Sequence, residues 1–143
     1  MAKSNAAQKV ADIAESSVRG DPKSSQSALL RALGDVKFEV LHNQVLVAGY
    51  IEPAKTSGGI ILTDKQRDED IYQGSVGMVI GMGPGAFKDD RVAQFHGVTL
   101  KLHDWVLYRP SDGLGMYVNQ VPCRLFQDTN ILMRIQNPDN FWS

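Results

Sequence analysis

Near its middle the chain reads Gly74-Ser75-Val76-Gly77-Met78-Val79-Ile80-Gly81, a short apolar run interrupted by glycines. From Val36 onward, similar runs rich in Val, Ile, Leu and Tyr are separated by Gly, Pro, Asn and Asp, which is typical of a β protein. We predict six strands, at residues 45–50, 74–81, 105–108, 116–118, 124–127 and 131–135. Because the strands are short and no helical period separates them, the sequence favours an all-β fold, a small irregular barrel, over a parallel sheet.

The first 35 residues differ in composition from the rest of the chain. Ala and Ser supply 13 of them, none is aromatic, and Gly20-Asp21-Pro22 divides the segment. Apolar side chains recur at helical spacing in each half: Val10, Ile13, Ala14 and Val18, then Leu29, Leu30 and Leu33. This spacing predicts a partly helical arm with apolar faces for a partner. A flexible Ser-rich leader is the alternative, because few large apolar groups offset the entropy lost on ordering. The chain thus divides into an arm (1–35), a barrel domain (36–136) and a tail (137–143).

Composition and charge exclude several classes of function. The chain has 143 residues and a mass of 15.7 kDa, with 15 Lys and Arg against 16 Asp and Glu. This balance gives no general attraction to nucleic acid or to an anionic membrane, so neither is an expected partner. The single cysteine, Cys123, permits no internal disulfide, which favours a cytoplasmic location. No apolar run is long enough to span a bilayer, and the N-terminus lacks the apolar core of a signal peptide.

The segment from residue 53 to residue 73 interrupts the strand pattern. Gly58-Gly59 precedes the apolar triplet Ile60-Ile61-Leu62, and a charged run follows at residues 64–70. Paired glycines give the backbone unusual freedom, and the charged run has little reason to be buried. The pattern predicts a long mobile surface loop whose exposed triplet binds a partner. A short buried strand at residues 60–62 is the alternative.

Three stretches then occur in a characteristic order, at residues 41–47, 55–63 and 74–83. The middle one reads Lys55-Thr56-Ser57-Gly58-Gly59-Ile60-Ile61-Leu62-Thr63. In this order and spacing they resemble the GroES-type co-chaperonins, the chaperonin-10 family. Residues 100–108 and 128–135 add weaker similarity, so that the resemblance covers about residues 38–136.

The resemblance implies a fold and an activity. Family members are irregular β-barrels that assemble into a dome-shaped ring of seven and extend a mobile loop toward a chaperonin ring. By position, Ile60, Ile61 and Leu62 would enter an apolar groove of a GroEL-type apical domain, and Gly58 and Gly59 would act as the loop hinge. The protein would need no cofactor, since the partner chaperonin would bind the ATP that drives assisted folding.

The resemblance also assigns a roof and a subunit interface. The insert at residues 84–99 lies where the family has its roof hairpin, with Gly85, Phe87, Lys88, Asp89, Asp90 and Arg91. The closing strand, with Ile131, Leu132, Met133 and Ile135, would pair with a neighbour's first strand at Val45, Leu46 and Val47 and so build the ring.

Catalytic and metal-binding motifs are not recognisable, so we expect no enzyme and no metal site. His42, His96 and His103 lack metal-ligand spacing, and Cys123 has no nucleophile motif around it. The glycine-rich residues 81–85 lack the Lys-Ser/Thr ending of a phosphate loop.

Several positions depart from the family pattern, which leaves a second function open. Val40, Asn43, Gln44 and His103-Asp104 replace residues typical of the family, and the arm and the tail have no counterpart in its compact bacterial members. A virus-encoded relative would show such changes, with a location in the host cytoplasm. The alternative is therefore a virion structural protein, a capsid decoration or connector subunit with capsid partners. Phe141 and Trp142 would pack on a neighbour or on their own barrel.

Overall fold

Six strands, two α-helices and three short 3-10 helices form the regular structure of residues 2–54 and 72–141, which the computed structural model describes. The helices are α1 (Ala2–Ser16) and α2 (Pro22–Leu33). The strands are β1 (Gln44–Ile51), β2 (Tyr72–Met82), β3 (Trp105–Tyr108), β4 (Leu114–Val118), β5 (Val121–Gln127) and β6 (Ile131–Ile135). All six predicted strands are confirmed, and the observed ones extend up to three residues beyond the predicted ends.

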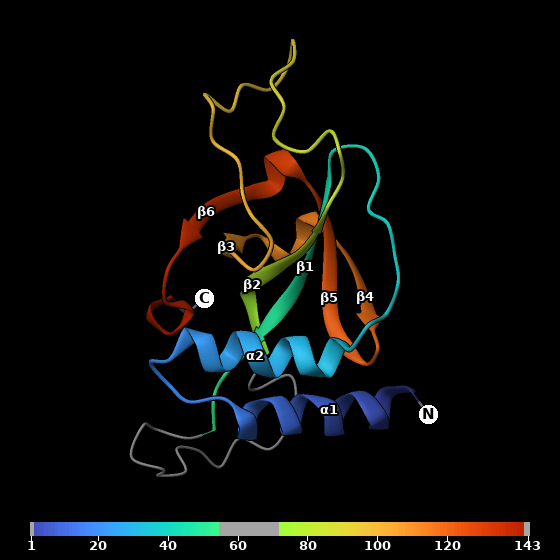
Figure 1. Cartoon of the computed structure of the whole chain (residues 1–143), viewed down its shortest axis with the longest axis vertical. Coiled ribbons are helices and arrows are strands. Elements are labelled where there is room, and N and C mark those ends of the chain that lie inside the picture. Colours follow the sequence, from blue (N-terminus) through green and yellow to red (C-terminus); the bar gives the residue numbers. More distant parts are fainter. Residues whose placement is uncertain (1, 55–71, 142–143) are drawn as a thin grey trace.

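The strands form one antiparallel sheet in the order β4-β5-β1-β2-β3-β6 (Figure 1). Irregularities in register interrupt β1 at Leu46/Val47 and Gly49/Tyr50, and β3 at Leu107/Tyr108. Such bulges increase the local twist and bend a strand. The sheet therefore curls into the irregular barrel that the sequence predicts, with β1 and β2 in its wall.

Two apolar clusters lie on opposite faces of this wall. Val45 and Val47 of β1 belong to the cluster inside the barrel, together with Val79, Tyr108 and Phe126. Leu46, Ala48 and Tyr50 alternate with them and belong to the cluster under the helices, together with Met78 and Trp105. Side chains alternate between the faces of a strand, so a strand covered on both faces has a continuous apolar run.

Close packing of the wall requires a glycine at one point. A Cβ atom on Gly77 of β2 would lie 2.4 Å from Val47 Cγ1 and 2.6 Å from the Ala48 carbonyl oxygen. Both distances are shorter than a carbon atom can approach, so only glycine lets β1 and β2 lie this close.

The N-terminal arm is folded against its own barrel. Val10, Ile13 and Ala14 of α1 and Leu29 and Leu33 of α2 are buried in the same cluster as the outer face of the sheet. The helical spacing is thus confirmed and the flexible leader is not observed. Val18 lies beyond α1, in the turn before α2. In the described part of the chain neither helix is long and apolar enough to cross a membrane.

The β4–β5 hairpin holds the end of α2. Asn119 and Gln120 connect the two strands with φ angles of 48° and 70°, the backbone of a tight two-residue turn. The Asn119 amide donates hydrogen bonds to the carbonyl oxygens of Ala32 at 2.9 Å and Leu33 at 3.2 Å. These carbonyls lie in the last turn of α2, where no helical partner is available.

Candidate functional site

The predicted chaperonin-binding residues Ile60, Ile61 and Leu62 and the hinge residues Gly58 and Gly59 lie outside the described residues. The strand ends on either side of them are described. Ile51 of β1 pairs with Tyr72 of β2, and Tyr50 pairs with Gln73. The segment 55–71 therefore starts and ends at adjoining strand ends, at one end of the sheet.

The end of β1 lies beside the N-terminal arm. The backbone N–H of Ala54 donates a hydrogen bond of 2.9 Å to the carbonyl oxygen of Ala14 in α1. The Tyr50 hydroxyl donates a hydrogen bond to Asp139 Oδ1 in the tail. Burial, with the hydrogen bond and the negative charge of Asp139, raises the pKa of Tyr50 far above its ordinary value. The hydroxyl group is thus a permanent donor rather than an acid or a base.

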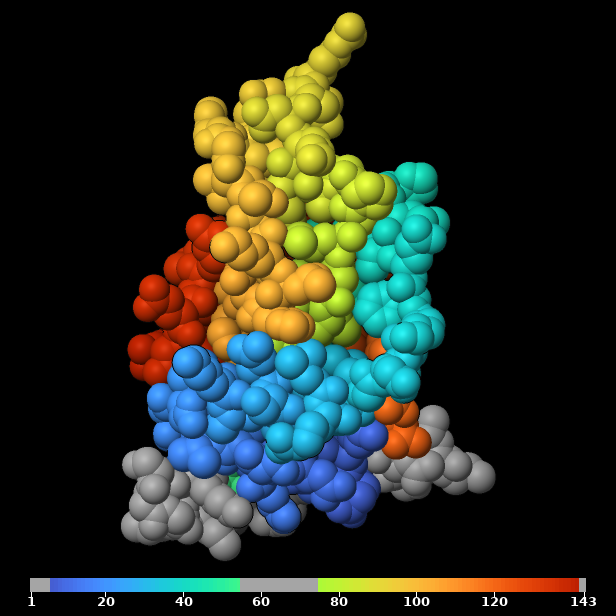
Figure 2. Space-filling model, in the orientation of Figure 1, coloured from blue at the N-terminus to red at the C-terminus, as the bar shows by residue number. Residues whose placement is uncertain are grey.

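The roof insert stands out from the opposite end of the molecule (Figure 2, yellow to gold). Between Met82 and Trp105 the insert contains no strand, so the described chain has a long folded-back loop there instead of a paired β-hairpin. Asp90 turns the loop back, since its Oδ1 accepts hydrogen bonds of 2.7 Å from the N–H groups of Val92 and Ala93. Phe87 and Phe95 contact each other edge to face with centroids 5.5 Å apart. Lys88, Asp89 and Arg91 are exposed beside them.

A buried carboxylate joins the roof to the barrel. Asp128 is 4% exposed, and its Oδ1 accepts a hydrogen bond of 3.1 Å from Asn43 Nδ2. Its Oδ2 accepts a hydrogen bond of 3.0 Å from the backbone N–H of Phe87. Asn43, one of the departures from the family pattern, is therefore a partner in this junction. The sequence places Asp128 only between the predicted strands at residues 124–127 and 131–135 and gives no sign that it is buried.

The predicted pairing of a neighbour's closing strand with Val45, Leu46 and Val47 is wrong. β1 is paired along one edge with β2 and along the other with β5. These three side chains are also at most 5% exposed. A central strand has no free backbone groups, so a second subunit cannot add to it.

The closing strand, in contrast, has a free edge. Among the described residues, β6 pairs only with β3, so its other edge has no partner strand. Leu132 and Met133 are 47% and 46% exposed, Ile131 is half-buried and Ile135 is buried. Three of the four predicted interface residues of β6 are thus accessible to a neighbour.

Residues 36–40 form a second accessible backbone, which sequence reasoning did not identify. They belong to no helix or strand, and no backbone–backbone hydrogen bond joins them to the rest of the described chain. Val36 and Phe38 are about half exposed. The alternation of Val36, Phe38 and Val40 is the signal that could have identified this strand-like segment.

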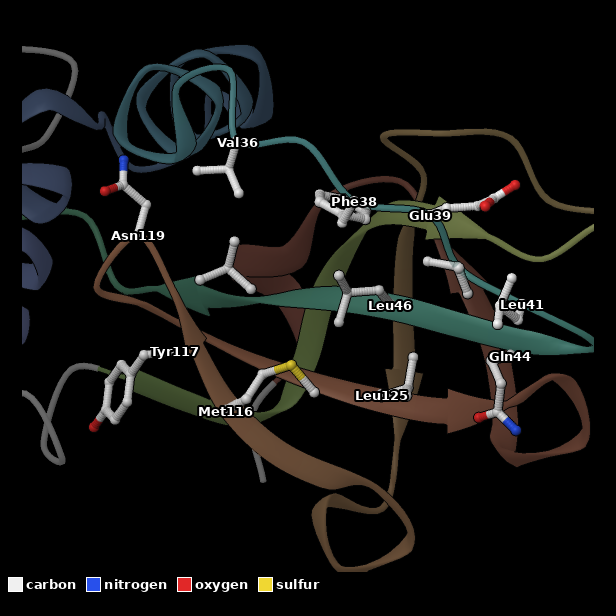
Figure 3. Close-up of a pocket in the computed structure, with 12 residues that line it drawn as sticks. Val36, Phe38, Glu39, Leu41, Gln44, Leu46, Met116, Tyr117, Asn119 and Leu125 are labelled. Carbon is white, nitrogen blue, oxygen red and sulfur yellow. The ribbon is translucent and has the colours of Figure 1, made fainter.

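This segment forms one wall of an apolar groove of about 520 Å³ (Figure 3). Leu46 of β1, Met116 of β4 and Leu125 of β5 lie on its other sides. Gly81 of β2 makes room for the segment, because a Cβ atom there would lie 2.9 Å from Phe38 Cε1. An apolar groove beside a backbone with free hydrogen-bonding groups has the features of a protein-binding surface.

The three histidines lie in turns, and the single cysteine is buried. His42, His96 and His103 all have positive φ angles and occupy turns. Burial raises the pKa of the Cys123 thiol to about 12, so it remains protonated and unreactive at neutral pH. No three His, Cys, Asp or Glu side chains gather to hold a metal ion in residues 2–54 and 72–141.

Comparison with known proteins identifies the barrel. The family described as Chaperonin 10 Kd subunit matches residues 37–135, more than half of the chain. The Co-chaperonin GroES of Parvibaculum lavamentivorans is 29% identical over 97 residues, which cover 68% of this chain and 87% of that protein. The 10 kDa chaperonin of Brassica napus is 33% identical over 90 residues, which cover 63% of this chain and 85% of that protein. The matched region contains the whole sheet, residues 55–71 between β1 and β2, and the roof insert. The chain therefore belongs to the chaperonin-10 family.

Proposed function

We propose that this protein is a co-chaperonin that caps a chaperonin ring and assists ATP-dependent protein folding. The observation that carries the proposal is a chaperonin-10 barrel in which residues 55–71 are inserted between the paired ends of β1 and β2. Members of this family are not enzymes, and they act with a chaperonin partner. A GroEL-type apical domain is the partner that we propose here.

Ile60, Ile61 and Leu62 supply the binding energy in this proposal. Burying an aliphatic side chain contributes about 1.5–3 kcal/mol, whereas ordering a segment on binding costs about 2–5 kcal/mol. One segment therefore binds weakly. When one segment of a ring binds, the effective concentration of the other segments at their grooves rises, so the assembled lid binds firmly. The lid still dissociates when the affinity of every groove falls by a modest amount.

The ring forms through the free edge of β6 in our proposal. The partner surface is residues 36–40 and the apolar groove of the neighbouring subunit, because this backbone makes no backbone–backbone hydrogen bond within the described chain. Leu132 and Met133 would then be covered on assembly. This arrangement replaces the pairing with Val45–Val47 that the structure excludes. We propose seven subunits, the number that the family resemblance implies.

Co-migration with a GroEL-type chaperonin in the presence of ATP tests this function. We expect the wild-type protein to bind, and the variant Ile60→Ser/Ile61→Ser/Leu62→Ser to lose binding while it still assembles. Val92→Ser is the matched control, because it removes an aliphatic side chain that is 94% exposed on the roof insert. Absence of wild-type binding, or full binding by the triple variant, would contradict the proposal.

Two features that favoured a virion structural protein now have an explanation within the subunit. The arm packs on its own barrel, and Phe141 packs against the cluster under the helices. The co-chaperonin is accordingly the one function that we propose.

A further inference from the structure

Two extensions of the chain lie outside the family match and contact each other. The family match begins at residue 37 and ends at residue 135, so it contains neither the helical arm nor the tail. The backbone N–H of Gly20, between the two helices, donates a hydrogen bond to Asp139 Oδ2 in the tail. The other oxygen of the same carboxylate accepts from the Tyr50 hydroxyl, near the end of β1. One side chain of the tail thus connects the arm to the strand from which residues 55–71 continue.

The arm makes two more polar contacts with the same end of β1. The N–H of Ala54, the last described residue before that segment, donates to the carbonyl oxygen of Ala14 at 2.9 Å. Arg19 Nη2 lies 2.7 Å from Glu52 Oε1, with the two side chains 31% and 12% exposed. Every second residue at this end of β1, namely Tyr50, Glu52 and Ala54, is thus bonded to the arm or to the tail.

We propose that the arm and the tail form a collar, made of Ala14, Arg19, Gly20 and Asp139, that fixes residues 50–54 and so sets the direction in which the chaperonin-binding segment leaves the subunit. This inference rests on the function proposed above. Arg19 and Asp139 are positioning residues in it, because they act on the partner only through the strand end that they hold.

The physical advantage of the collar is entropic. A segment that is held at its first residue has fewer conformations to lose when it binds. Several segments that leave a ring in the same direction also reach their grooves together, which raises the effective concentration after the first contact. If residues 50–54 were not held, the segment would lose more entropy on binding and the segments of a ring would no longer leave it in the same direction, although the binding residues were unchanged.

The collar contacts are polar, and the Arg19–Glu52 pair lies outside the apolar cluster, whereas Asp139 bonds to Tyr50 within it. Val10, Ile13 and Leu29 still hold the helices on the sheet when Arg19 or Asp139 is changed. Arg19→Gln and Asp139→Ala are therefore suitable variants. Arg31→Gln and Asp12→Ala are matched controls, since both side chains are exposed on the two helices of the arm.

Hydrogen exchange of the assembled full-length protein provides the first measurement. In both collar variants we expect exchange of the Ala54 amide to become about tenfold faster, the loss expected for one charged hydrogen bond. The thermal midpoint of Arg19→Gln should stay close to that of the controls, whereas Asp139→Ala should lower it, because the buried Tyr50 hydroxyl loses this acceptor. Unchanged exchange at Ala54 would overturn the collar.

Dissociation of the protein from a GroEL-type chaperonin with ATP provides the second measurement. We expect the collar variants to dissociate at least about threefold faster than the controls, because a small loss at each segment is multiplied over the ring. The charge reversal Arg19→Glu with Glu52→Arg should restore slow dissociation, which a general loss of stability would not permit.

The outcomes separate the collar from the proposed function. If the wild-type protein binds and the collar variants dissociate at the control rate, the positioning role is wrong and the co-chaperonin function stands. If the wild-type protein does not bind, the proposed function fails and the positioning role with it. The exchange measurement then still decides whether the extensions hold residues 50–54.

Discussion

Asp128 shows how a single residue determines the geometry of the roof. Its two carboxylate oxygens accept hydrogen bonds from the side chain of Asn43 and from the backbone N–H of Phe87. Asn43 directly precedes β1, and Phe87 follows β2 in the sequence. The backbone N–H of Asp128 also donates a hydrogen bond of 3.0 Å to the Asn43 carbonyl oxygen. Phe87 has a φ angle of 61°, an uncommon value for a bulky residue, so this backbone needs a firm partner.

We expect Asp128→Ala to destabilise the protein by at least about 2 kcal/mol, because two donors lose a charged acceptor in a buried site. Asp128→Asn keeps one acceptor oxygen and should cost less. Urea unfolding measures both changes in the free energy of unfolding. Asp112→Ala is the control, since this carboxylate lies 3.6 Å from an exposed Arg109 at the surface. A cost for Asp128→Ala equal to that of the control would contradict the junction.

Among the elements, the turn in the roof insert depends on the solvent-exposed carboxylate of Asp90. Hydrogen bonds from the backbone N–H groups of Ala93 and Val92 lower the pKa of Asp90 below its ordinary value of 3.8. A lowered pKa in the folded state means that the turn is stabilised above the ordinary value and loses this stabilisation as the pH falls through the folded pKa.

We therefore expect the roof turn to be unchanged from pH 8 to pH 5 and to loosen only in strong acid. Amide chemical shifts of Val92 and Ala93 should move together, with a midpoint below 3.8. Asp90→Asn removes this titration and serves as the control. A midpoint at or above the ordinary aspartate value would show that the two amides do not bind the carboxylate.

The elements were largely predictable, because each one has a clear apolar period. Val10, Ile13 and Ala14 recur at helical spacing and are buried together, and the apolar runs at 45–50 and 105–108 became strands. The placement of the helices was harder to predict. The unbroken apolar run of β1 implies that other elements pack on both faces of the strand. No local pattern shows that α1 and α2 are the elements that pack on one of these faces.

The predicted chaperonin-binding triplet and its glycines lie outside the described residues and stay a prediction. The choice of Val45–Val47 as an interface was wrong, because both edges of β1 are paired within the subunit. Strand order is a property of the whole sheet, so the sequence of β1 contains no sign that both its edges are occupied. The contacts of the collar could not be predicted either, because Ala14, Arg19 and Asp139 are distant from Ala54 in sequence.

At the scale of the whole molecule, the sheet has two edge strands, β4 and β6, and both have exposed apolar side chains. β6 leaves Leu132 and Met133 nearly half exposed, next to a backbone edge without a partner strand in the described chain. Long apolar edges promote association unless they are covered, so a co-chaperonin ring is the assembly that would cover this one. The ring then depends on β6 far more than on any residue of the buried wall.

We expect Leu132→Lys/Met133→Lys to reduce the native assembly to single subunits of about 15.7 kDa. Charged side chains on a strand edge oppose pairing, and loss of two apolar contacts of about 1.5 kcal/mol or more each weakens an interface about 100-fold. Native mass spectrometry measures the assembly, and circular dichroism checks that the isolated subunit stays folded. Val92→Lys, which places a charge on the roof insert, should leave the assembly intact. An unchanged assembly mass for the double variant would show that the interface does not involve β6. If the variant is a monomer and also fails to bind chaperonin, firm binding requires several binding segments on one ring.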